Sequence, residues 1–203
     1  YRDMPQPDSP SLHDNLENKP DYQRIWAQTA SKRGDAAHAA ALLGCNSFID
    51  SEIGRVLEAV QRLAPDALVL FTSDHGAALD AHQLSAKGAA VYDEIARIPL
   101  IFAGGPCQTG AVRRHVVSHA DVPATVLDYM GLDAPPAFTG RSLMGDLAAD
   151  DGRDGLAYIE FNRYERDHDG FGGFQPMRAI VTDEWKLALH LTDLDELYHT
   201  PTD

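Results

Sequence analysis

The chain has 203 residues, 44% of them hydrophobic, and a formal net charge of −14 at pH 7. This length and apolar content are enough to bury a core in one or two domains. The acidic balance argues against nucleic acid or an anionic membrane surface as the partner. No apolar run approaches the roughly 20 residues that a membrane span needs, and the two cysteines, Cys45 and Cys107, are too few for a disulfide framework.

The first third of the chain changes from an irregular to a helical pattern. Residues 1–33 are rich in proline and aspartate, which predicts an irregular surface segment with a short helix at residues 22–30. From residue 35 to residue 63, apolar residues recur at intervals of three and four. This spacing predicts one long amphipathic helix, which the sequence Ala64-Pro65-Asp66 ends.

Two short apolar runs follow, at residues 67–71 and 98–103, and each predicts a buried strand. Asp74 and His75 stand just beyond the first run, before a glycine that permits a sharp turn. In open α/β sheets, ligands bind at the carboxyl ends of strands, where this pair can present one oxygen and one imidazole nitrogen to a metal. The same residues are also ordinary turn formers, so the pair alone leaves both interpretations open.

Lys87 lies in a loop of small residues and is one of four lysines in the chain. No acidic residue at helical spacing pairs with it, and no apolar stripe requires it. A lysine in such a loop is usually a solvated side chain, whereas beside a reacting anion it stabilises negative charge.

The second half of the chain is predicted to begin with a strand at residues 112–117 and a helix that starts at Asp121. The carboxylate of Asp121 is expected to cap the free amide groups of that helix, which a glycine at position 131 ends.

Beyond an acidic linker at residues 148–154, three further apolar runs predict strands. They span residues 156–160, 177–182 and 185–190. The loop between the first two contains Asp167-His168-Asp169, which could bind a metal but is more typical of a solvated glycine-rich loop.

The order and spacing of these motifs resemble the sulfatases, a branch of the alkaline phosphatase superfamily. The matching runs, in chain order, are Thr72-Ser73-Asp74-His75-Gly76, His82-Gln83-Leu84, Lys87, Tyr92-Asp93-Glu94, Arg97-Ile98-Pro99-Leu100-Ile101, Gly140-Arg141-Ser142-Leu143 and Leu194-Asp195-Glu196-Leu197-Tyr198. The Asp-His-Gly run is shared across the superfamily and is weak by itself, and the lysine and the Arg-Ile-Pro-Leu-Ile run behind it make the resemblance strong.

The resemblance implies an α/β fold, with a sulfatase-like mixed sheet flanked by helices and a small antiparallel sheet at the C-terminus. Residues 1–147 are expected to form the carboxyl-terminal part of the catalytic domain, and residues 148–203 a small subdomain. Both ends of the chain are expected to be cut, because it begins at Tyr1 without a methionine and stops where the family continues.

The resemblance also implies roles for four side chains. Asp74 and His75 match ligands of one divalent metal, with Ca²⁺ or Mn²⁺ expected. Lys87 would hold an oxygen of a small anionic ester, and His82 is either a second catalytic group or an anchor for the lysine. The family's nucleophile is a formylglycine made from Cys or Ser in C/S-x-P-x-R, which this sequence does not contain. The chain alone is therefore expected to be inactive.

Three alternatives to sulfate ester hydrolysis remain open at this point. A phosphonate monoester or phosphodiester hydrolase shares the same motifs. A distant phosphatase or mutase also shares Asp-His-Gly, although Lys87 disfavours it. A non-catalytic binding domain that kept the fold is the alternative from another class.

Overall fold

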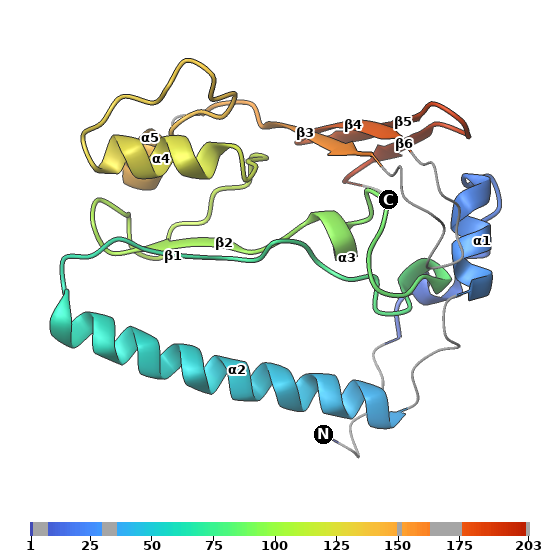
Figure 1. The fold of residues 1–203 in the computed structure, drawn as a ribbon, viewed down its shortest axis with the longest axis horizontal. Coiled ribbons are helices and arrows are strands. Elements are labelled where there is room, and N and C mark those ends of the chain that lie inside the picture. Colours follow the sequence, from blue (N-terminus) through green and yellow to red (C-terminus); the bar gives the residue numbers. More distant parts are fainter. Residues whose placement is uncertain (2–7, 30–35, 150–151, 163–175, 202–203) are drawn as a thin grey trace. The chain divides into compact units, whose positions relative to one another are not determined.

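The computed structural model describes residues 1, 8–29, 36–149, 152–162 and 176–201. The described chain divides into two compact units, an N-terminal unit of the described residues up to 105 and a C-terminal unit of those from 106 onward. Figure 1 labels the helices and strands of each. Among the described residues, no helix is both long and apolar enough to span a bilayer. The domain boundary expected at residues 147–148 concerns the family's own division and stays a prediction.

The N-terminal unit carries helices and one pair of strands. Its elements are the 3-10 helix η1 (Pro10–His13), α1 (Asp21–Thr29), α2 (Ala36–Leu63), β1 (Val69–Thr72), the 3-10 helix η2 (Ala81–Gln83), α3 (Asp93–Ala96) and β2 (Leu100–Ala103). The two helices predicted before residue 64 are thus confirmed. Strands β1 and β2 pair antiparallel, with Thr72 opposite Leu100, so β1 ends beside the start of β2.

The expectation that both strands are buried is wrong within this unit. Phe71 of β1 is 40% exposed and Ile101 of β2 is 56% exposed. Among the described residues, the sheet of this unit has two strands, and their side chains are only partly covered. Apolar side chains of α2, such as Phe48 and Val56, are also exposed.

The core of the N-terminal unit lies between the segment around α1 and the loop after β1. Leu16, Tyr22 and Trp26 are buried on one side, and Leu84 and Tyr92 on the other. The prediction that residues 1–33 form only a surface segment is therefore wrong for its second half. Helical spacing places Tyr22 and Trp26 on one face of α1, where both can enter a core.

The C-terminal unit combines two helices with a four-stranded sheet. Its elements are α4 (Asp121–Tyr129), α5 (Met144–Ala148), β3 (Leu156–Phe161), β4 (Met177–Thr182), β5 (Trp185–His190) and β6 (Glu196–His199). The sheet is antiparallel throughout, in the order β3-β4-β5-β6. The three predicted strands and the small antiparallel sheet are confirmed, and β6 adds a fourth strand over part of the last sulfatase-like run.

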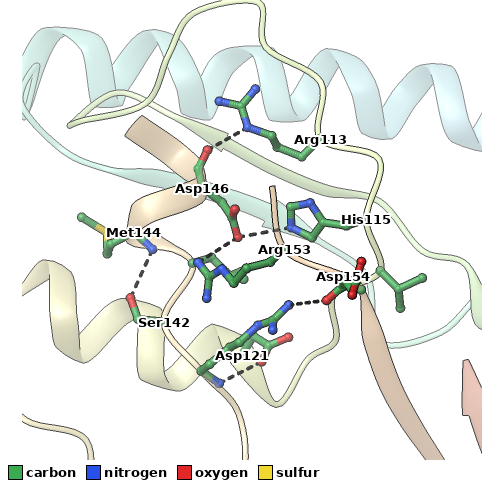
Figure 2. A network of polar contacts seen from close by, with 12 residues as sticks. Arg113, His115, Asp121, Ser142, Met144, Asp146, Arg153 and Asp154 are labelled. Atoms are coloured by element: carbon green, nitrogen blue, oxygen red, sulfur yellow. Dashed lines mark hydrogen bonds and ion pairs between the residues drawn. The ribbon is translucent and has the colours of Figure 1, made fainter. Parts of the chain in front are cut away.

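The strand predicted at residues 112–117 is wrong, because this segment uses its polar groups for other contacts. The N–H of Val116 donates to Asp183 Oδ1 at 2.6 Å, in the turn between β4 and β5. Figure 2 shows the carboxylate of Asp146, on α5, between His115 and Arg153. The Asp146 Oδ2 atom lies 3.2 Å from His115 Nε2. These contacts tie the segment to α5 and to the hairpin instead of to a neighbouring strand.

Asp121 begins α4 as predicted, but its carboxylate does not cap the helix. It accepts hydrogen bonds from the backbone N–H groups of Ser118 at 2.8 Å and Arg141 at 2.9 Å. Asp121 is buried, and it joins the turn before α4 to the sulfatase-like run at residues 140–143 (Figure 2). Its role is architectural.

Candidate active site

The turn after β1 holds the Asp74 carboxylate in its ionised form. The Oδ1 atom accepts the backbone N–H of His75 at 2.9 Å, and this hydrogen bond lowers the pKa of Asp74 below its ordinary value of 3.8. The side chain is 82% exposed, so the carboxylate is open to a ligand. The second oxygen, Oδ2, is directed at the neighbouring imidazole.

The ring of His75 is oriented by a carbonyl group. Its Nδ1 atom lies 2.8 Å from the carbonyl oxygen of Gly76. A carbonyl oxygen only accepts hydrogen bonds, so Nδ1 carries the hydrogen and the neutral ring has its lone pair on Nε2. That Nε2 atom lies 3.3 Å from Asp74 Oδ2. Two acceptor atoms thus face the same space, an arrangement that a cation between them satisfies.

Gly76 fixes this turn against the helix α3. Its N–H donates to the carbonyl of Ile95 at 2.9 Å. A Cβ atom at this position would lie 2.0 Å from the carbonyl oxygen of Glu94, a distance that no side chain tolerates. Glycine is therefore required for the close approach that places Asp74 and His75 at the end of β1.

The loop that carries Lys87 follows this turn in the chain and folds back on itself. The N–H of Ala78 donates to the carbonyl of Ala86 at 2.8 Å, and the N–H of Asp80 to the carbonyl of Leu84 at 3.0 Å. Lys87 directly follows Ala86, the acceptor of the first of these hydrogen bonds, and its side chain is exposed. These backbone hydrogen bonds close the loop that runs from Ala78, two residues beyond Gly76, to Ala86.

His82 helps to hold this loop in place. Its Nδ1 atom is 2.7 Å from Asp14 Oδ2, and its Nε2 atom is 3.8 Å from Glu94 Oε2. The ring stacks on Tyr92, with 3.6 Å between the ring centroids, and the side chain is 17% exposed. These are the contacts of an anchor, and a catalytic role for His82 stays a prediction.

Asp74 and His75 are the candidate ligands that this chain offers to a divalent cation. In the part of the chain that the structure describes, no group of three or more His, Cys, Asp or Glu residues has the arrangement of a metal site, so Asp74 and His75 are a pair of candidate ligands. One carboxylate oxygen and one imidazole nitrogen match the ligands that divalent metals take. The alternative motif, Asp167-His168-Asp169, lies outside the described residues.

The sequence did not single out Asp14, Tyr22 and Trp26 as contacts of the loop. All three lie in the segment that was expected to be irregular surface. The one local signal is the four-residue spacing of Tyr22 and Trp26 on α1, which is typical of a helix with a buried face.

Comparison with known proteins gives the class of the fold and then the family. Residues 9–132 match the family described as Sulfatase, and residues 82–203 match the family described as N-sulphoglucosamine sulphohydrolase, C-terminal. A curated relative, the "Uncharacterized sulfatase YidJ" of Escherichia coli (strain K12), is 42% identical over 197 residues, 94% of this chain and 38% of that protein.

Two solved structures share the fold. A putative sulfatase from Bacteroides thetaiotaomicron VPI-5482 has a TM-score of 0.80 at 20% identity, over 98% of this chain and 46% of that one. The phosphonate monoester hydrolase SpPMH from Silicibacter pomeroyi has a TM-score of 0.81 at 21% identity, over 99% of this chain and 45% of that one. These likenesses show the fold alone, which is the sulfatase-like α/β fold that was predicted.

The family model over residues 9–132 shows that the chain belongs to the sulfatase family. The resemblance inferred from the motifs is confirmed. The chain spans less than half the length of the E. coli relative and of both solved chains.

Proposed function

We propose that the complete protein hydrolyses sulfate esters, with Asp74 and His75 among the ligands of one divalent metal ion. The observation that carries the proposal is the pair of acceptor atoms, Asp74 Oδ2 and His75 Nε2, that face each other across 3.3 Å. A bound divalent ion would polarise a sulfuryl oxygen as a Lewis acid. Asp74 contributes a negative charge that persists to acidic pH, and His75 a lone pair whose direction the Gly76 carbonyl fixes.

The imidazole bears on which ion is bound. Calcium takes oxygen ligands almost exclusively, whereas imidazole suits manganese, iron or zinc. Of the two ions expected from the family, calcium and manganese, the ligand set of Asp74 and His75 favours manganese. The remaining ligands and the formylglycine nucleophile are expected outside residues 1–203.

Lys87 is proposed to act on the ester itself. A small anionic ester gains negative charge on its oxygens as the bond to the leaving group breaks, and a fixed ammonium group stabilises that charge. Lys87 is exposed, and no ion pair in the described residues involves it, so its charge is available to a ligand.

A phosphonate monoester hydrolase is the second candidate, because the solved enzyme of that class shares the fold over 99% of this chain. Sulfate and phosphonate esters both present anionic oxygens around a tetrahedral centre. An Asp-His pair and one lysine serve either ester, so the substrate has to be decided by assay.

Metal content tests the proposed site most simply. The complete protein, purified without chelator, is compared with Asp74→Asn and His75→Ala by elemental analysis. Asp133→Asn is the matched control, because Asp133 is an exposed carboxylate in the C-terminal unit. The proposal predicts close to one divalent ion per chain in the unchanged protein and the control, and a clear loss in the two site variants. Equal metal content in all four proteins would contradict it.

A further inference from the structure

The loop that carries Lys87 has a strained backbone. Five residues between positions 79 and 86 have left-handed φ angles of 49–71° although none of them is glycine; they are Leu79, Asp80, His82, Gln83 and Ala86. Side chains other than glycine disfavour this conformation, so it persists only where the surroundings enforce it. The loop therefore needs contacts from outside itself to stay in its observed form.

Trp26 of α1 supplies one such contact just before Lys87. Its indole Nε1–H donates to the carbonyl oxygen of Ser85 at 3.1 Å. Its ring packs so closely on Gly88 that a Cβ atom there would lie 2.9 Å from the indole carbons. Trp26 is 2% exposed, so it is shielded from any substrate.

Tyr22 supplies the matching contact just after Lys87. Its hydroxyl donates to the carbonyl oxygen of Ala89. Tyr22 and Trp26 are one helical turn apart on α1, so their side chains project from the same face. The carbonyl groups that they bind belong to residues 85 and 89, which flank Lys87 on both sides.

A third contact holds the far end of the loop. Asp14 Oδ2 binds His82 Nδ1 at 2.7 Å, and the His82 ring stacks on Tyr92. The Tyr92 hydroxyl in turn donates to Gln23 Oε1, also on α1, at 2.6 Å. The segment of residues 14–26 thus contacts the loop within its strained stretch and again beyond it.

We propose that the segment of residues 14–26 is a brace that positions Lys87, with Trp26 and Tyr22 as its principal positioning residues. This inference rests on the proposed role of Lys87 in the reaction. The brace acts by holding the two carbonyl groups beside the lysine. A reacting group that is displaced by about 1 Å can lose up to about 100-fold in rate, so a loosened brace lowers turnover without removing the lysine.

Kinetics of the complete protein test whether the brace acts through the lysine. Trp26→Phe keeps most of the ring and removes the hydrogen bond to Ser85, and we expect kcat/KM to fall by about tenfold. Trp185→Phe, at the chain's other tryptophan, is the matched control and should leave kcat/KM unchanged. In a Lys87→Ala background, Trp26→Phe should lower kcat/KM no further. If the double variant instead lost kcat/KM by the product of the two single losses, the proposal would be overturned, because the brace would then act independently of the lysine.

Proteolysis tests the brace without any assay of activity. An endoprotease that cleaves after lysine is added to the complete folded protein, and cleavage after Lys87 is followed by mass spectrometry, with Lys186 in β5 as the internal reference. Trp26→Phe should speed cleavage after Lys87 at least several-fold and leave Lys186 unchanged, because local opening exposes the loop. Tyr22→Phe, which removes only a hydroxyl group, should act in the same direction.

Unchanged cleavage after Lys87 in both variants would overturn the brace, whatever the kinetics show. Faster cleavage together with normal turnover of Lys87→Ala would instead refute the proposed role of the lysine and leave the brace in place. The two failures are therefore distinguishable.

Discussion

Replacing Lys87 by alanine should damage the chemical step far more than the fold. Lys87 is exposed and has no ion pair in the described part of the chain, so its removal takes away neither buried apolar surface nor a salt bridge. Surface substitutions of this kind usually change the free energy of unfolding by less than about 0.5 kcal/mol. We therefore expect the melting temperature to stay within about 1–2 °C of the unchanged protein.

The expected effect on rate is much larger. Loss of one fixed donor to the charge of a transition state typically lowers the rate by about 10²–10³, or about 3–4 kcal/mol in activation free energy. Lys87→Ala should lower kcat/KM of the complete protein for an aryl sulfate by that factor. Lys87→Arg should recover only part of it, because a planar guanidinium does not replace a compact ammonium group.

The assay pairs initial rates with thermal unfolding of the same preparations. A large loss of rate with an unchanged melting temperature supports a role in the reaction. Turnover of Lys87→Ala close to that of the unchanged protein would refute the reasoning, because the lysine would then be only a solvated loop residue.

Three further predictions follow from the chain and its contacts. The 203-residue chain purified by itself should not hydrolyse an aryl sulfate, since it lacks the C/S-x-P-x-R motif; turnover of about 1 per second or more would contradict this. Burial raises the pKa of Asp14, but hydrogen bonds, first the one from His82, lower it more, so the net pKa lies below 3.8. The ionised carboxylate therefore contributes stability that is complete at neutral pH and is lost as the pH falls below 3.8. Asp14→Asn should therefore lower the melting temperature at pH 7 and have a shrinking effect towards pH 3; an equal effect at both would count against the assignment. Asp183→Asn should cost about 1–3 kcal/mol in denaturant unfolding, because Val116 and Gly155 donate to different carboxylate oxygens and Asn replaces one of these with an NH2 group that cannot accept; a loss below about 0.5 kcal/mol would show these bonds to be dispensable.

Regular local patterns were predictable from the sequence. The three- and four-residue spacing indicated α2, and the short apolar runs indicated β1, β2 and three strands of the C-terminal sheet. The position of Asp74 and His75 just beyond β1 was predictable from the apolar run before them, and their role as a site stays a prediction. These features depend on residues that are close in sequence.

Contacts between distant segments were not predictable in this way. The bond from Tyr22 to Ala89 joins residues 67 positions apart, and neither residue belongs to a recognisable motif. The strand expected at residues 112–117 was wrong because Asp183, far along the chain, takes up a backbone N–H of that segment. Asp121 has the sequence of a helix cap, yet its carboxylate binds a distant loop. In each case a tertiary hydrogen bond replaced the local one.

The nature of the ester is the central claim, and one measurement tests it directly. The complete protein is assayed with an aryl sulfate and with an aryl phosphonate monoester of the same leaving group, each with and without added manganese. The account predicts that kcat/KM for the sulfate exceeds that for the phosphonate, and that Asp74→Asn abolishes the dependence on metal. Preference for the phosphonate monoester would contradict the sulfate assignment, and metal-independent turnover of the sulfate would contradict the site.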